Sequence, residues 1–201
     1  MENGQIKRIK NPPGAKFKWD KYITNSSNLI AHLLLEHQVG FTNRCIEINY
    51  KFRELTNKQN ITTKNISLSN FLEKNSDELL SYLLFKNEAK LPPDTKFGNP
   101  TFISDFETKQ TALGVSNGLR KLNLKNRLLE NRCSYMIFSN SFLGLPEQFK
   151  NLLLRKLKII LESKNEINLF SYLSNPEKEN ILRILSRSFY GFSNDVIYLK
   201  F

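Results

Sequence analysis

Glycine and proline are scarce in this chain of 201 residues, which contains eight and seven of them. Sandwiches and barrels connect many short strands through turns that depend on these two residues, so their scarcity disfavours an all-β architecture. No stretch approaches the roughly eighteen apolar residues that indicate a membrane span. The N-terminal stretch MENGQIKRIKNPPGAKFKW has no apolar core of signal-peptide length, so we expect a soluble chain without an export signal.

Cysteine is limited to Cys45 and Cys133, which form neither a CxxC nor a CxxCH motif. This spacing supports neither a zinc ribbon nor covalent haem attachment. Both residues stand among apolar neighbours, which predicts buried free thiols rather than a disulfide. Whether the two side chains meet stays open.

The common catalytic motifs are absent as well. The sequence contains no GxSxG, GxxxxGK[ST] or GxGxxG pattern, so a nucleophile elbow and a nucleotide-binding loop lack their usual residues. It also lacks the E-x-x-H pair of carboxylate-bridged di-iron sites, so we expect no metal site. A nucleophilic pair of Cys133 and His37 would require that the two side chains meet, which nothing in the sequence indicates. The sequence therefore favours a protein that is not an enzyme.

What the sequence does contain is helical periodicity. Apolar residues recur at steps of three and four over residues 29–55, which predicts one long amphipathic helix. The polar residues 25–27 are expected to cap its start. Gly40 within it indicates a kink or a close helix approach.

Three more helices are expected. One should start near residues 67–69, although the polar pair at 75–76 could split it. The stretch LPEQFKNLLLRKLKIILESKN, residues 145–165, is the clearest helix, with a proline suited to the first turn. Another should begin with Asn175 as N-cap and Pro176 as its first residue.

These elements predict a mainly α-helical fold, a multi-helix orthogonal bundle with room for one or two short strands. Residues 118–132 form either a short amphipathic helix or an irregular docking segment, and residues 133–138 either a buried strand-like piece or a short buried helix. Residues 1–22 are expected to be a basic extended arm, and residues 23–201 a single helical domain with a linker near 90–100.

The formal charge of +11, from 30 basic and 19 acidic residues, would attract polyanions such as nucleic acid. A residue usage biased toward Lys, Asn and Ile would raise the pI equally well without any anionic partner. The candidate anion-binding side chains are Arg120, Lys121, Lys125, Arg127, Arg155, Lys156 and Lys158. The alternative for this set is a solvated polar helix face.

Both histidines stand in the stretch NLIAHLLLEHQ. On a helix, His32 and Glu36 share a face, whereas His32 and His37 point about 140° apart and cannot both ligate one metal without other elements. His37 lies four residues after Leu33 and four before Phe41, on the apolar face. This position predicts a hydrogen-bonded core histidine, with an axial haem ligand or a proton-transfer group as the alternative.

Three stretches carry a family resemblance: YITNSSNLIAHLLLEHQVGFTNRCIEINYKFR, LLSYLLFKNEAKLP and LRKLNLKNRLLENRCSYMIFSNSFLGLPEQFKNLLLRKL. In this order they resemble the C-terminal region of large uncharacterised secreted bacterial proteins with a c-type cytochrome-like region upstream. The likeness covers residues 15–190. Glu36, His37 and Gln38 fall on the family's E-H-Q element and residues 133–137 on its C-S-Y stretch, while His32 matches nothing.

The chain departs from that family in having no CxxCH motif and no export signal, so any haem would come from a partner polypeptide. The resemblance implies a non-enzymatic helical module associated with a larger redox or haem-containing protein or assembly, with a protein partner such as a c-type cytochrome. His37 would serve there as an axial ligand or as an orienting hydrogen-bond partner. The alternative function is binding of nucleic acid or a ribonucleoprotein surface. A fragment of such a family would be periplasmic or extracellular, and a protein outside it cytoplasmic.

Overall fold

The computed structural model describes residues 28–57, 61–92, 100–109, 118–164, 169–190 and 198–199. Within these ranges the fold is mainly α-helical, which confirms the predicted fold class. The basic arm expected over residues 1–22 lies outside the described residues, as does most of the linker expected near 90–100. Among the described helices, none combines the length and the apolar composition needed to cross a bilayer.

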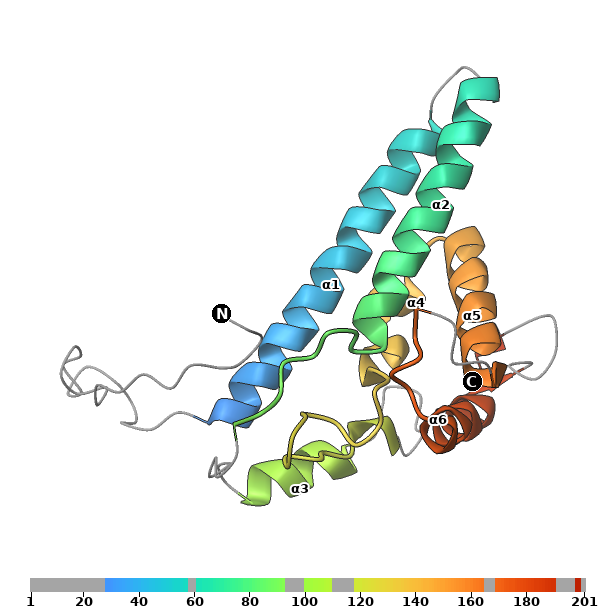
Figure 1. The fold of residues 1–201 in the computed structure, drawn as a ribbon. Coiled ribbons are helices and arrows are strands. Elements are labelled where there is room, and N and C mark those ends of the chain that lie inside the picture. Colours follow the sequence, from blue (N-terminus) through green and yellow to red (C-terminus); the bar gives the residue numbers. More distant parts are fainter. Residues whose placement is uncertain are drawn as a thin grey trace, which may run out of the picture.

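Two long helices form an antiparallel hairpin along one side of the molecule (Figure 1). Helix α1 (Leu29–Thr56) has 28 residues, and its extent agrees with the predicted periodicity. Its N-cap is Asn28, whose side chain accepts a hydrogen bond from the backbone N–H of Ala31 at 3.2 Å. The residues 25–27, which were expected to cap the helix, lie outside the described part of the chain.

Helix α2 (Ile61–Leu83) begins earlier than predicted. The expected start near residues 67–69 is wrong because serine, threonine and asparagine cost a helix only about 0.5 kcal/mol each, too little to stop it. Nor do Asn75 and Ser76 split the helix. Their side chains donate hydrogen bonds to the carbonyls of Phe71 and Glu73 within the same helix, at 2.8 and 2.9 Å.

Helix α1 passes through Gly40 without interruption, and α2 approaches it closely there. A Cβ atom at this position would collide with the hydroxyl group of Tyr82. Of the two expectations for Gly40, a kink or a close helix approach, the second is confirmed.

The remaining elements are short except for two helices. They are α3 (Pro100–Thr108), the 3-10 helices η3 (Gly118–Arg120) and η4 (Tyr135–Phe138), α4 (Asn140–Leu143), α5 (Glu147–Glu162), α6 (Asn175–Ser188) and the antiparallel pair β1 (Phe189–Tyr190) and β2 (Tyr198–Leu199). Helix α3 was not predicted. Residues 118–132 are largely irregular, which confirms the irregular alternative, and residues 133–138 contain a short buried helix rather than a strand-like piece. The N-cap position of α6 is Ser174, without a side-chain capping hydrogen bond, one residue before the expected Asn175.

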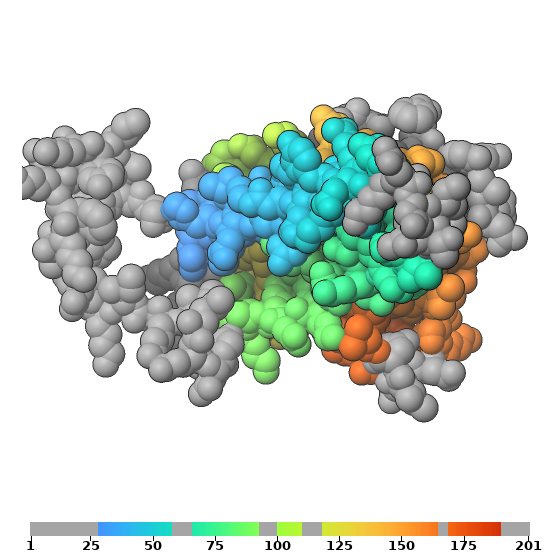
Figure 2. Space-filling view, turned by 90° about the horizontal axis from the view of Figure 1, so that it is seen from above, coloured from blue at the N-terminus to red at the C-terminus, as the bar shows by residue number. Residues whose placement is uncertain are grey.

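One hydrophobic core joins these elements. Helix α2 packs against α1 on one side and α5 on the other, and α6 packs against α5 near the foot of the hairpin (Figure 1). Helices α1, α2, α4, α5 and α6 each contribute fully buried side chains, for example Phe41, Leu80, Phe142, Leu157 and Leu185. In the view from above, α1 runs along the surface of the molecule (Figure 2).

Candidate functional site

The strongest site candidate is built around His37, on the buried side of α1. The residue is 8% exposed, and its Nε2 atom lies 2.6 Å from the hydroxyl oxygen of Ser134. The next side chain, Gln38, donates a hydrogen bond to the hydroxyl of Tyr135 at 2.9 Å. The two segments, which are 97 residues apart in sequence, are thus joined by two consecutive side-chain hydrogen bonds.

The hydrogen bonds of Ser134 assign the tautomer of His37. The Ser134 hydroxyl oxygen accepts from the backbone N–H of Met136 at 3.1 Å. In the assignment that gives the hydroxyl proton an acceptor, Ser134 donates to Nε2 of His37 and Nδ1 carries the imidazole proton. Burial, reinforced by the positive charge of Arg44, lowers the pKa of His37 from 6.5 to about 4. The ring is therefore neutral near pH 7, with Nδ1–H as a donor.

Two aromatic rings from α2 and the loop after it hold the imidazole. The Tyr82 ring lies parallel to it, with centroids 5.1 Å apart, and the Phe85 ring lies 4.6 Å away at an interplanar angle of 20°. The Tyr82 hydroxyl donates to the backbone carbonyl of His37 at 3.3 Å. The Arg44 guanidinium lies 3.8 Å above the Tyr82 ring in a cation–π contact. The ring of His37 is thereby fixed in position and orientation.

The backbone that delivers Phe85 has an unusual conformation. Helix α2 ends in a Schellman motif, in which the N–H of Phe85 bonds to the carbonyl of Tyr82 and the N–H of Lys86 to that of Ser81. The motif needs a left-handed residue, usually glycine, but here Phe85 adopts φ 54° and Asn87 follows at φ 62°. A left-handed conformation costs a bulky residue about 1–2 kcal/mol. At this cost in stability, the turn brings the Phe85 ring into contact with the imidazole of His37.

A cleft of about 940 Å³ opens beside these rings, between the first half of α1 and the loop that follows α2. Its apolar walls are Leu29, Leu33, Tyr82, Phe85, Ala89, Leu91 and Leu128, and its polar groups are His32, Glu36, His37, Lys86, Asn87 and Glu88. Helical phase separates the two histidines, as predicted. Both nevertheless line this cleft, because it extends around one side of α1.

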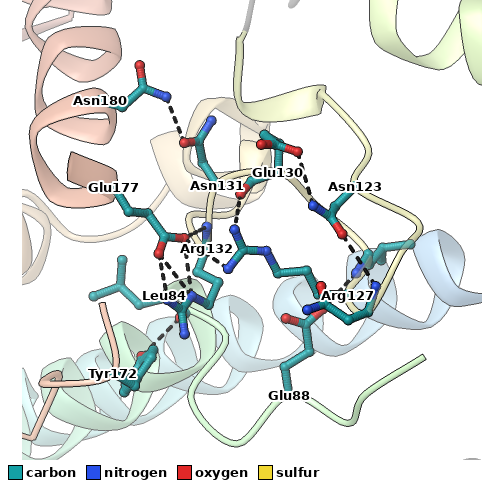
Figure 3. A network of polar contacts seen from close by, with 12 residues as sticks. Leu84, Glu88, Asn123, Arg127, Glu130, Asn131, Arg132, Tyr172, Glu177 and Asn180 are labelled. Atoms are coloured by element: carbon teal, nitrogen blue, oxygen red, sulfur yellow. Dashed lines mark hydrogen bonds and ion pairs between the residues drawn. The ribbon is translucent and has the colours of Figure 1, made fainter. Parts of the chain in front are cut away.

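A network of charged residues around the buried carboxylate of Glu177 includes Glu88, which lines the cleft (Figure 3). Glu177 of α6, with a side chain 8% exposed, accepts hydrogen bonds from two guanidinium nitrogens of Arg132, the shorter at 2.6 Å, and from its backbone N–H. Arg127 lies 3.5 Å from the same carboxylate. Glu88 accepts from the backbone N–H of Leu128 at 3.0 Å, and burial raises the pKa of Glu88 against the opposing effect of this bond and of the arginines. Residues on three segments are locked together in this way.

The seven predicted anion-binding side chains do not form one free basic surface. Arg120 donates to the carbonyl of Phe106 and lies over that ring, and Arg127 is paired with Glu177. Lys156 forms ion pairs with two carboxylates of α2, at 2.6 and 2.7 Å. The other four, Lys121, Lys125, Arg155 and Lys158, lie on two different segments, α5 and the loop after η3.

Sequence reasoning missed a different basic group. Arg183 and Arg187 of α6 lie beside Lys121 around a hollow of about 470 Å³, which Glu130 also lines. The only sequence signal was their spacing of four residues, which places both on one helix face.

The two cysteines are buried and free, as predicted. Burial raises the pKa of the Cys45 thiol to about 12 and that of Cys133 further still. Both thiols are therefore protonated and poor nucleophiles near pH 7. The described residues contain no group of three or more His, Cys, Asp or Glu side chains that could hold a metal ion.

Comparison with known proteins adds nothing to this geometry, because no family model, curated protein or solved structure matches the chain.

Proposed function

We propose that this chain is a non-enzymatic helical module of a larger redox or haem-containing assembly, and that it acts through the cleft beside His37. The observation that carries the proposal is the cleft itself, with a volume of about 940 Å³ and largely apolar walls. Sites for small molecules and cofactors have about 300–1,000 Å³ and combine such walls with a few fixed polar groups. We expect it to receive a flat, mainly apolar group that a partner polypeptide carries.

The state of the reactive side chains supports a binding rather than a catalytic role. A general base works best with a pKa near the operating pH, whereas the pKa of His37 is about 4. Its Nε2 atom is already bonded to Ser134, and the thiols of Cys45 and Cys133 are held protonated by burial. Each of these groups is stabilised in a form that does not take part in proton transfer or nucleophilic attack.

The geometry favours one of the two roles expected for His37. An axial ligand must offer a nitrogen lone pair to the iron, but the Nε2 lone pair accepts the Ser134 proton and Nδ1 carries a hydrogen. His37 is therefore proposed to orient a bound group through hydrogen bonding. His32 is exposed and lines the same cleft, so we propose it as the imidazole that would coordinate a metal in that group.

A haemin titration monitored at the Soret band tests this proposal. We expect a saturable shift for the wild type, which Ala89→Phe weakens at least about tenfold by filling the cleft. Ala31→Phe is the matched control, since Ala31 is also half-buried but lines a hollow formed with other residues, including Gln38 and Phe106.

Histidine variants separate the two roles. If His37 orients the bound group, His37→Gln keeps the wild-type spectrum and lowers the affinity, whereas His32→Ala changes the spectrum. A His37→Gln spectrum that loses its ligand-field bands would assign His37 as the axial ligand and refute the orienting role. Absence of any shift with haemin and with a c-type cytochrome would refute the proposed function.

The alternative function, nucleic-acid binding, has no comparable support. Of the seven basic residues expected to contact phosphates, Arg120, Arg127 and Lys156 are engaged with other side chains or carbonyls of the chain. Affinity for nucleic acid that falls steeply with added salt would nevertheless favour it, because phosphate contacts release counterions.

A further inference from the structure

One face of α1 exposes large apolar side chains along most of its length. Leu35, Val39, Ile46 and Tyr50 are 56%, 48%, 47% and 70% exposed. At 100° per residue they fall within an arc of about 60°. This apolar stripe lies on the side of α1 away from the core residues Phe41, Cys45 and Ile48, on a helix that runs along the molecular surface (Figure 2).

The spacing of the stripe is that of one continuous helix face. Its four residues follow each other at steps of four, seven and four, each close to a whole number of helical turns. Such a face can pack lengthwise against another helix rather than against water. His32 and Arg53 lie on the same side of the helix, beyond the two ends of the stripe.

The stripe is also symmetric about its own centre. The pair Leu35 and Tyr50 and the pair Val39 and Ile46 have the same midpoint, between Thr42 and Asn43. A surface of this kind is complementary to itself after a two-fold rotation, which is the requirement for an isologous dimer contact.

We propose that a second copy of this chain docks antiparallel along the apolar stripe of α1, with the two-fold axis between Thr42 and Asn43. Leu35 then packs against Tyr50 of the second copy, and Val39 against Ile46. The contact forms a two-stranded seam that covers the exposed apolar groups of both chains.

Charge complementarity supports the second copy and its direction. In the antiparallel arrangement, Arg53 of one chain lies opposite His32 of the other, one helical turn from the exposed carboxylate of Glu36. A parallel pair would instead place Glu36 against Glu36 and Arg53 against Arg53. Like charges in such positions are unfavourable, and opposite charges select the antiparallel direction.

Sedimentation equilibrium of the full chain tests the association. We expect a mass that rises with concentration from 23.5 kDa toward twice that value. Val39→Glu and Ile46→Glu should each raise the dimer dissociation constant at least about tenfold without unfolding the chain, because both positions are solvent-exposed in the monomer. Ile159→Glu, at a still more exposed isoleucine on α5 (67%), is the control and should leave the dissociation constant unchanged.

Disulfide trapping tests the direction of the pair. Cysteine substituted at the exposed Asn43, next to the two-fold axis, should link two copies on mild oxidation, while cysteine at the exposed Lys74 of α2 should not. The native thiols are buried and do not compete. A mixture of Leu35→Cys and Tyr50→Cys chains should yield the mixed dimer. Self-linked Leu35→Cys in its place would refute the antiparallel arrangement, and a chain that stays monomeric at about 100 μM would refute the docking itself.

Discussion

Removal of the Glu177 carboxylate should destabilise the fold strongly. The Glu177→Ala change leaves the guanidinium groups of Arg132 and Arg127 without their counter-charge, and the backbone N–H of Arg132 without its acceptor. Loss of one partner from a buried ion pair costs about 3–5 kcal/mol. The side chains of Arg132 and Arg127 are 21% and 25% exposed, so water partly solvates their charges. We therefore expect a loss of unfolding free energy of about 3 kcal/mol, near the lower end of this range.

Urea unfolding followed by circular dichroism measures this loss as a change in the free energy of unfolding. Glu47→Ala is the control, because Glu47 forms an ion pair with Lys51 in which both side chains are more than half exposed, 62% and 51%. Exposed pairs contribute little to stability, so this variant should unfold almost as the wild type does. If Glu177→Ala proves no more destabilising than Glu47→Ala, the network around Glu177 does not stabilise the fold as we argue.

Three further changes test other parts of the structure by the same unfolding measurement. His37 has a folded-state pKa of about 4 against 6.5 in the unfolded chain, so the native state resists protonation and stability falls as pH falls below 6.5. Between pH 8 and 5.5 the loss should be about 1.4 kcal/mol, and a His37→Gln chain that loses as much over this interval would exclude His37 as the cause. Gly40→Ala should destabilise the wild type through its collision with the Tyr82 hydroxyl and should cost a Tyr82→Phe chain less, because the hydroxyl is then absent and the nearest ring atom, Cζ, stands 3.1 Å from the new Cβ; an equal loss in both backgrounds would contradict the contact with the hydroxyl. Asn87→Gly should stabilise by about 0.5 kcal/mol, because glycine adopts the left-handed φ of 62° without strain, and a loss of stability would argue against that backbone conformation.

The helices that the sequence predicted well are those with one continuous buried face. Helix α1 shows its apolar period over 28 residues, and α5 has a proline before its first turn and an uninterrupted leucine stripe. Helix α3 was missed because it has nine residues and one buried side chain, Phe106, which is too little for a period to be recognised. The start of α2 was misplaced because polar residues weaken a helix without ending it.

The candidate site was predictable only in part, because half of it is defined by tertiary contact. The helical phase of His37 correctly indicated a buried, hydrogen-bonded ring. Its partner Ser134 lies 97 residues away, and no local pattern connects the two. The left-handed turn at Phe85 was also invisible, since a phenylalanine gives no turn signal and glycine is the residue expected in that position.

The charge of the sequence was the feature that predicted least about the site, again because its effect depends on tertiary contacts. Whether a basic side chain is available to a ligand depends on which carboxylates the fold brings near it. Lys156 and Lys158 belong to one basic run, yet Lys156 reaches across to Glu73 and Asp77 on α2. A stretch of basic residues on one helix therefore predicts neither a free surface nor an anionic partner.

Two features that break local rules meet at the cleft beside α1, although Leu124 also adopts a left-handed φ, 55°, outside it. A phenylalanine occupies a left-handed position that favours glycine, and a histidine is buried in a form whose protonation the fold opposes. Each costs stability that a glycine and an aliphatic residue would not, and both face the cleft beside α1. Natural sequences that agree with local preferences elsewhere tend to violate them where a site requires a particular group. If Phe85 and His37 served packing alone, the simpler residues would do so at lower cost, and this is why our proposal concerns the cleft rather than the charged surface.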